Sequence, residues 1–274
     1  MARDDVPLIL DWAAQEGWNP GLTDAEPFFA ADPEGFFVGR IEGEPVGCVS
    51  AVAYGPTFGF LGMYIVRPDW RGRGHGMALW RHAMERLEPR NVGLDGVVAQ
   101  QGNYRKSGFV LAHRNIRHGG ERVRADEPDT SAGRIVSLGS MAMDSVERYD
   151  RPYFPVPRRA FLEKWITQKG TRALGLLRDG TLAGYGCIRP CRTGFKIGPL
   201  FAEDEPGAEA LFRGLVAGLS ESIFLDTPEP NVAAIRLAER HGLKPVFETA
   251  RMYTRTPPRI DLKRVYGLTS FELG

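Results

Sequence analysis

The chain has 274 residues, of which 43% are hydrophobic, so it is long enough for one or two globular domains with cores of their own. Its 35 basic and 34 acidic residues leave a net charge of only +1, which argues against a nucleic-acid or membrane-surface binder that depends on a concentrated basic field. Any anion site must therefore be local.

Cysteine and histidine usage gives no sign of a metal site. The cysteines Cys48, Cys187 and Cys191 form no C-x-x-C pair, and the five histidines lack the spacing of a zinc motif. We therefore expect no metal and no disulfide framework. The N-terminus carries acidic residues in its first positions, and no run reaches the roughly 18 apolar residues of a membrane span. These features favour a cytoplasmic protein that does not enter a membrane.

The first elements of the chain read as a helix followed by a hairpin. Apolar residues at helical spacing predict a helix over 4–17. The next segment contains Trp18 and Asp24 and is rich in Gly, Pro and aromatic residues, a composition that suits a loop and a short helix over a pocket. Residues 36–41 and 45–54 then predict two antiparallel strands around a turn.

The segment 58–87 organises the first half. An apolar, β-branched and aromatic run ends at Val66, the glycine-rich sequence RGRGHG follows, and an amphipathic stretch completes the pattern of strand, loop and helix. The alternating glycines leave room for backbone N–H groups to converge on an anion at a helix N-terminus. The alternative is an ordinary turn before a surface helix.

The spacing of this loop separates it from two other phosphate-binding motifs. No Lys or Ser/Thr follows the glycines as in a Walker loop, and strict alternation is not the G-x-G-x-x-G of a dinucleotide site. The pattern R-x-x-G-x-G at Arg71, Gly74 and Gly76, after V-x-P at Val66 and Pro68, resembles motif A of the GNAT superfamily of N-acetyltransferases. In that family the loop binds the pyrophosphate of acetyl-CoA.

The elements after the loop agree with this resemblance. Residues 92–99 predict a strand, a brief helix ends at Gly108, and residues 110–117 predict a closing strand. The order departs from the family at its start, where a GNAT domain has a strand before the first helix. Either this chain lacks that strand, or another segment, such as the apolar C-terminal RVYGLTSFELG, takes its place.

The resemblance implies a cofactor site and candidate catalytic residues. The residues it implies for binding acetyl-CoA are Tyr64, Ile65, Val66, Arg71, Gly72, Arg73, Gly74, His75 and Gly76. A backbone N–H on the strand would stabilise the oxyanion, and Tyr104 would protonate the departing thiolate, unless it only covers the end of the sheet. The base that frees the amine is open between Glu16, Asp24 and a chain of water molecules, and Glu16 fits a helix end equally well.

A polar, turn-rich segment at 119–133 predicts a linker to a second half that repeats the first. The pattern predicts helices at 158–168, 207–219 and 231–242 and strands at 173–178, 182–189, 195–201 and 222–226. Here Glu203, Asp204 and Glu205 replace the glycine loop, and their charges repel an anion but suit a helix N-terminus. The helix that resembles GNAT motif B has Ala238 where the family often has Tyr. We expect the second half not to bind CoA in this manner.

Two strings, WAAQEGWNPG and GLDGVVAQQGNY, followed by an acetyltransferase-like second half, resemble the YitH-like tandem GNAT proteins. In such proteins the second half is expected to shape the acceptor pocket. The acceptor-binding candidates, each of which could instead be a core or cap residue, are Trp18, Asp24, Tyr153, Phe154, Trp165, Asp226 and Asn231.

The predicted fold class is α/β (α+β), with tandem GNAT-like domains at 1–118 and 134–274, each a mixed, mostly antiparallel sheet flanked by helices. The predicted function is acetyl-CoA-dependent N-acetyltransfer to the amine of a small molecule, by direct transfer in the first half. The alternative is a non-catalytic binding or regulatory module that responds to CoA or acetyl-CoA. We expect no nucleic-acid partner.

Overall fold

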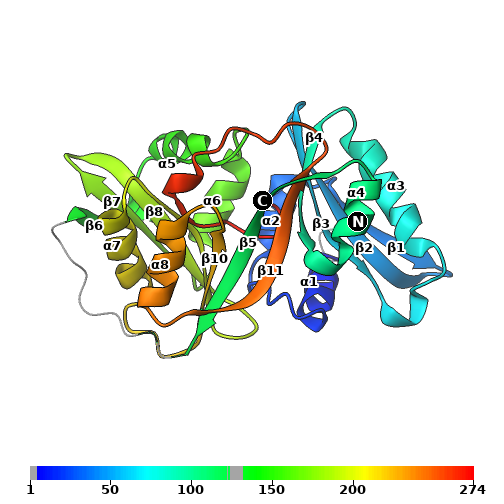
Figure 1. The fold of residues 1–274 in the computed structure, drawn as a ribbon, viewed down its shortest axis with the longest axis horizontal. Helices are drawn as coiled ribbons and strands as arrows, with labels where there is room; N and C mark the ends of the chain where they lie inside the picture. The colour runs from blue at the N-terminus through cyan, green and yellow to red at the C-terminus, as the bar shows by residue number, and fades with distance from the viewer. Residues whose placement is uncertain (1–4, 122, 124–131) are drawn as a thin grey trace.

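The structure is a computed structural model that describes residues 5–121, 123 and 132–274. Its central feature is one mixed, mostly antiparallel sheet that continues through both halves of the chain (Figure 1). In the described residues the strand order is β1-β2-β3-β4-β11-β5-β10-β9-β8-β7-β6, and β12 pairs with β9 beside this path.

The first half forms the elements that its sequence pattern predicts. They are α1 (Val6–Gln15), α2 (Ala25–Ala31), β1 (Phe36–Ile41), β2 (Glu44–Tyr54), β3 (Phe58–Val66), α3 (His75–Leu87), β4 (Asn91–Val97), α4 (Gln101–Lys106) and β5 (Val110–Gly120). Among the described residues no strand precedes α1. β5 extends three residues beyond the predicted end at residue 117, because its pairing with β10 continues to Gly120.

The second half contains the predicted elements and several that were not predicted. Its elements are β6 (Arg134–Ser137), α5 (Met143–Asp150), α6 (Arg159–Thr167), β7 (Arg172–Arg178), β8 (Thr181–Pro190), β9 (Phe195–Ala202), α7 (Glu205–Val216), β10 (Ile223–Pro228), α8 (Val232–Arg240), β11 (Lys244–Tyr253) and β12 (Val265–Gly267). The elements that the sequence pattern did not predict are β6, α5 and β11. The predicted linker at 119–133 begins inside β5, and its residues 122 and 124–131 lie outside the described part of the chain.

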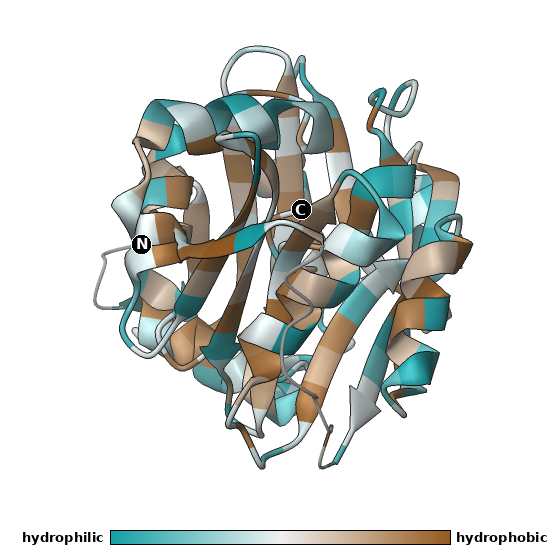
Figure 2. Cartoon of the chain, turned by 90° about the vertical axis from the view of Figure 1, so that its left-hand side faces the viewer, coloured by the Kyte–Doolittle hydropathy of each residue, from teal (hydrophilic) through white to brown (hydrophobic). Residues whose placement is uncertain are grey.

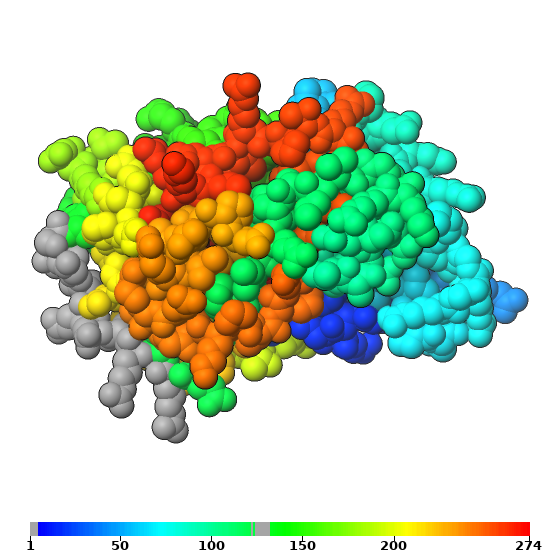
Figure 3. Space-filling model, in the orientation of Figure 1, coloured from blue at the N-terminus to red at the C-terminus, as the bar shows by residue number. Residues whose placement is uncertain are grey.

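The two halves interlock through the strands β5 and β11. β11, from the end of the chain, lies between β4 and β5 and is antiparallel to both. β5 in turn lies between β11 and β10. Each half therefore has a strand of the other half inserted into its sheet, and Figure 1 shows these two long strands side by side at the centre of the molecule. The space-filling view shows residues of the second half packed directly against residues of the first half (Figure 3).

Helices cover both faces of the sheet and enclose three apolar clusters. On one face α1 and α2 of the first half pack beside α5 and α6 of the second, over a core shared by both halves. On the other face α3 covers the first half, while α7 and α8 cover the second. Figure 2 shows hydrophobic residues concentrated on the strands and on the helix surfaces that face them.

The alternation of side chains along β2 explains why the sheet needs both layers of helices. Cys48, Val52 and Tyr54 belong to the shared core, whereas Val49 and Ala51 belong to the cluster under α3. Successive side chains of a strand point to opposite faces. Because both sets are apolar, each face of β2 must be covered.

The C-terminal segment does not supply the missing first strand. Val265–Gly267 forms β12, but β12 pairs with β9 of the second half rather than with a strand of the first. The residues after it cross to the first half, where the backbone of Leu273 accepts a hydrogen bond from Tyr54 Oη at 3.1 Å. We refer to residues 265–274 as the C-terminal tail.

Candidate active site

The site lies where the parallel strands β3 and β4 diverge. Their pairing covers only Phe58 to Leu61 on β3 and Asn91 to Leu94 on β4. Beyond this point β3 remains paired with β2 and β4 with β11, so the two strands separate and leave their facing edges open. A cavity of about 770 Å³ occupies the opening. An extended ligand could bond to these edges as an added strand would.

A bulge in β3 marks the middle of the opening. Gly62 pairs opposite Ser50 and Ile65 opposite Cys48, so two residues of β3 stand against one of β2. Met63 in this bulge has a φ of +46°. A bulge re-aims the backbone and side chains locally. Residues 61–66 of β3 all line the cavity, including Tyr64, Ile65 and Val66.

The structure explains in different ways why glycine occupies positions 72, 74 and 76 of the loop. Gly72 and Gly74 have φ values of +76° and +88°, a conformation that favours glycine, and the space where their side chains would stand is open. Gly76 has a different role, since a Cβ there would lie 2.7 Å from the hydroxyl oxygen of Tyr64. Gly74 caps α3, so the free backbone N–H groups of the first helical turn open onto the loop.

The basic residues of the loop are held by neighbouring groups. Arg71 lines the cavity, donates from Nε to the carbonyl oxygen of Val66 at 2.8 Å and forms an ion pair with Glu16. The guanidinium of Arg73 lies 5.0 Å from the ring centroid of Trp70. Glu16, predicted as a catalytic base, thus contacts Arg71, and it also lines the cavity.

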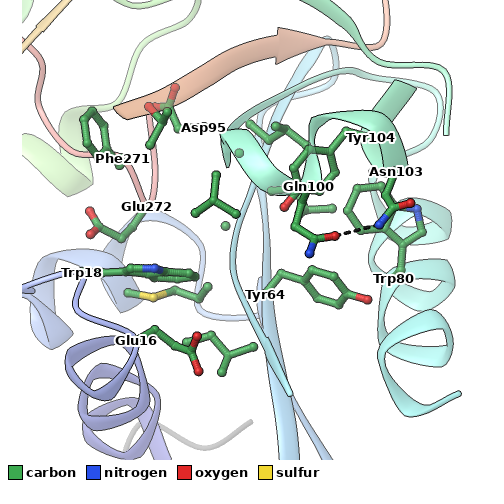
Figure 4. A pocket seen from close by; sticks show the side chains of 18 of the residues that line it. Glu16, Trp18, Tyr64, Trp80, Asp95, Gln100, Asn103, Tyr104, Phe271 and Glu272 are labelled. Carbon is green, nitrogen blue, oxygen red and sulfur yellow. Dashed lines mark hydrogen bonds between the residues drawn. The ribbon is translucent and has the colours of Figure 1, made fainter. Parts of the chain in front are cut away.

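Tyr104 stands on the wall opposite Glu16 and lines the cavity (Figure 4). Its ring stacks on Trp80 with centroids 5.6 Å apart, and it fits against Gly96, where a Cβ would lie 2.2 Å from a Tyr104 ring carbon. Burial, with a smaller contribution from Tyr64, raises the pKa of Tyr104 to about 12. The phenol therefore keeps its proton at neutral pH, as a proton donor must.

The far end of the cavity is built from segments that are distant in the sequence. Trp18 follows α1, Arg117 lies on β5, Phe247 on β11 and Phe271 on the C-terminal tail, and all four line the cavity. Arg117 donates to the carbonyl oxygen of Trp18 at 2.7 Å, and its guanidinium carbon lies 4.8 Å from the ring centroid of Phe271. Trp18 is the member of this group that the sequence analysis named.

Six of the seven acceptor-binding candidates lie outside the cavity and have structural contacts instead. Asp24 is fully buried and pairs with Arg189 at 2.7 Å, and Asp226 is equally buried and pairs with Arg117 at 2.7 Å. Tyr153 packs against other aromatic rings in the shared core. These residues and Asn231 do not line the cavity, and the same holds for Phe154 and Trp165. Asp226 does not line the cavity itself, but it binds Arg117, which does.

Asn231 anchors the C-terminal tail. Its side chain accepts a hydrogen bond from the Ala234 backbone at the start of α8 and donates to the carbonyl oxygens of Lys263 and Val265. The tail enters the opening between β9 and β10, which pair over only three residues. There β12 pairs with β9, and the Leu268 N–H donates to the Asp226 carbonyl oxygen at 2.8 Å. The opening of the second half that corresponds to the cavity is therefore filled by the chain itself.

The acidic residues of the second half have a local structural use. Asp204 caps α7 by accepting a hydrogen bond from the Gly207 backbone at 2.9 Å, and it pairs with Arg178 at 2.6 Å. Glu205 pairs with Arg236. These contacts agree with the helix-stabilising interpretation of the acids.

Sequence patterns did not point to the cavity residues that come from β5, β11 and the tail: Arg117, Phe247, Thr249, Phe271 and Glu272. A weak signal was available, because RVYGLTSFELG is mostly apolar yet carries one acidic residue, Glu272, near its end. Buried acids need a partner or a function. Within the described residues, no cluster of side chains could hold a metal ion, and no helix is long and apolar enough to cross a membrane.

Comparison with known proteins gives matches over both halves. Residues 5–109 match the family described as acetyltransferase (GNAT) family, and residues 146–267 match an acetyltransferase (GNAT) domain. Holothin acyltransferase from Pseudoalteromonas sp. (strain SANK 73390) is 31% identical over 274 residues, which cover 99% of this chain and 92% of the relative.

Solved structures show the same fold. The structure of a proposed acetyltransferase from Pyrococcus horikoshii superposes with a TM-score of 0.85 at 22% identity, covering 100% of this chain and 94% of the other. A tandem GNAT protein from the clavulanic acid biosynthesis pathway has a TM-score of 0.65 at 16% identity, covering 94% of this chain and 98% of the other. The tandem arrangement is thus shared by proteins of distant sequence.

Proposed function

Since the chain belongs to the GNAT family of acyltransferases, we propose that it transfers an acetyl group from acetyl-CoA to the amine of a small molecule. The reaction is proposed for the cavity between β3 and β4. The observation that carries this proposal is that one cavity joins the edge of β3, Arg71 beside the glycine loop and Tyr104 on the opposite wall.

The residues of the loop and of β3 fit an acyl-CoA. The space beside Gly72 and Gly74 is open, and the N–H groups at the start of α3, together with Arg71 and Arg73, suit a pyrophosphate. The open edge of β3 offers backbone groups to the pantetheine arm. When bound, acetyl-CoA supplies the thioester carbonyl that the acceptor amine attacks.

The chain's own residues would orient the reactants and move protons. A backbone N–H in the β3 bulge stabilises negative charge on the carbonyl oxygen. Tyr104, which keeps its proton at neutral pH, donates it to the departing sulfur. Glu16 holds Arg71 beside the loop, so we assign it a positioning role in place of the base.

Calorimetry with acetyl-CoA tests the cofactor site. We expect micromolar binding that falls at least about tenfold in the Arg71→Ala, Arg73→Ala double variant, since each charged hydrogen bond contributes roughly 1.5–3 kcal/mol. The matched control, Arg81→Ala with Arg259→Ala, removes two exposed arginines outside the cavity and should bind normally. Undetectable binding to the unmodified protein contradicts the proposal.

Release of free CoA thiol in the presence of primary amines tests turnover. Amine-dependent release supports the transferase, and a change from acetyl-CoA to longer acyl-CoA thioesters measures the acyl preference. Binding of acetyl-CoA without thiol release from any amine would favour the non-catalytic regulatory module instead.

A further inference from the structure

The C-terminal tail brings an acidic residue, Glu272, to the bulge of β3. A Cβ at Gly62 would lie 2.0 Å from the carbonyl oxygen of Glu272, so the tail backbone touches β3 at this point. Glu272 lines the cavity between Phe271 and Trp18, across from Tyr104 (Figure 4). It therefore stands beside the strand that we propose to hold the thioester.

Glu272 is buried without a hydrogen-bond partner. Only 4% of the residue is exposed, and its Oε2 atom is shut off from solvent with no donor in reach. No hydrogen bond or ion pair joins its carboxylate to any described residue. Roughly nine in ten buried polar groups have a partner, and an unpaired one costs about 1–3 kcal/mol. Such a carboxylate is suited to a ligand that brings its own donor.

The other two acids that line the cavity already have partners. Glu16 pairs with Arg71. Asp95 accepts hydrogen bonds from Arg251 at 2.6 Å and from Asn115 at 2.7 Å. Among the described cavity residues, Glu272 is thus the carboxylate that remains available to a substrate.

The charged groups around Glu272 come from several elements. Arg117 on β5 is bound by Asp226 on β10, and Arg189 on β8 is bound by Asp24. Lys196 on β9 has no carboxylate partner in the described structure and donates to the Asn19 carbonyl oxygen at 2.7 Å.

Glu272 raises the pKa values of these three basic groups. Burial lowers the pKa of Lys196, and Arg117 lowers it further, while Glu272 acts in the opposite direction. Glu272 likewise favours the protonated forms of Arg117 and Arg189. Two of the three cations are bound by aspartates, and the pKa of the third, Lys196, is raised by Asp226 as well as by Glu272.

We propose that Glu272 binds the ammonium group of the acceptor and removes its proton before transfer. This inference rests on the proposed function of the cavity. Because Trp18, Phe247 and Phe271 form the adjacent walls, the acceptor class is a primary amine attached to a flat apolar body.

The proton transfers balance across the reaction. The Glu272 carboxylate takes one proton from R–NH₃⁺, and the resulting neutral amine forms its N–C bond as the C–S bond of the thioester breaks. Tyr104 gives its proton to the departing sulfur and regains one, through solvent, from the nitrogen. Glu272 returns its proton to solvent, so the products are an amide, CoA thiol and one proton.

Kinetics of Glu272→Gln with tryptamine and phenethylamine test the inference. Gln keeps the size of the side chain, so acetyl-CoA affinity by calorimetry should stay within about twofold. At pH 7 we expect kcat/KM for the amines to fall by about 100-fold, within the usual range for a lost general base. The deficit should shrink as the pH rises toward the pKa of the amine, because more acceptor then arrives unprotonated.

The control is Glu248→Gln on β11, which removes a charge that does not line the cavity and breaks only a half-exposed pair with Arg114. It should leave both measurements unchanged. An unaltered kcat/KM in Glu272→Gln, or a deficit that is equal at every pH, overturns the assignment. If wild type binds acetyl-CoA but acetylates neither amine, the acceptor class is wrong, whereas absent acetyl-CoA binding overturns the proposed function itself.

Discussion

Replacement of Gly62 by Ala tests whether the tail must touch β3. The new Cβ would lie 2.0 Å from the Glu272 carbonyl oxygen and 3.1 Å from Ser50 Oγ. β3 cannot retreat easily because β2 pairs with it on both sides of the bulge. We therefore expect the tail to shift by more than 1 Å, since carbon–oxygen contacts under about 3 Å are strongly repulsive.

The energetic cost follows from what the tail buries. Phe271 and Leu273 are 7% and 1% exposed, and the Leu273 carbonyl accepts the hydrogen bond from Tyr54. Overpacking that shifts such groups without expelling them costs about 1–3 kcal/mol. Full expulsion of both side chains would cost more, about 1.5–3 kcal/mol for each.

Thermal unfolding and amine kinetics, measured together, decide the outcome. The melting temperature should fall by about 2–4 °C for each kcal/mol, and kcat/KM for amines should fall while acetyl-CoA binding persists. Gly139→Ala is the matched control, because its nearest contact is an ordinary 3.8 Å. If Gly62→Ala unfolds and reacts like the unmodified protein, the position of the tail does not depend on its contact with Gly62.

Three further changes probe other parts of the structure. Tyr104→Phe keeps the stacking on Trp80 and should lower kcat about 100-fold with little loss of acetyl-CoA binding. Because the pKa of Tyr104 is raised to about 12, its ionisation should cause no loss of wild-type activity between neutral pH and pH values well below 12. Unchanged turnover would remove it from the acid role. A hydrogen bond from His241 lowers the pKa of Glu209 to about 2, so its stabilising effect is complete above the ordinary value of 4.5 and is lost as the pH falls toward 2. In urea titrations, Glu209→Gln should be less stable than wild type at pH 7 and should show a smaller drop over that acid range; an identical pH profile would contradict this. Asn231→Ala loses a helix cap, one hydrogen bond to the tail at Val265 and one to Lys263 just before it, so denaturant titration should show a loss of about 1–3 kcal/mol. No loss would mean that the tail is held elsewhere.

Local sequence patterns determined most of the elements and the loop. The strand before Val66, the alternating glycines and the helix after them depend on neighbours in the chain, because backbone conformation and helix capping act within a few residues. Even here the reasons differ between positions. Gly72 and Gly74 adopt positive φ values that favour glycine. Gly76 instead makes room for the side chain of Tyr64, a contact that the spacing of the glycines does not reveal.

The strand exchange was decided only by tertiary structure. The order of elements in each half suggests two separate sheets, yet β11 lies between β4 and β5. The backbone edge of a strand accepts any partner of suitable register, so sequence does not state which strand pairs with which. The domain bounds 1–118 and 134–274 stay a prediction from the sequence repeat, and one sheet continues through both halves.

The end of the cavity that we propose for the acceptor was likewise decided by tertiary structure. Asp24, Tyr153, Asp226 and Asn231 were acceptor-binding candidates from the sequence, but in the structure the two acids pair with arginines, the tyrosine packs in the core and the asparagine binds the tail. The sequence by itself determined a GNAT-like loop, its helix and Tyr104, because these are short-range patterns. Which groups face that loop across the cavity was decided by long-range packing, which carries Arg117, Phe247 and Glu272 from distant parts of the chain to one place.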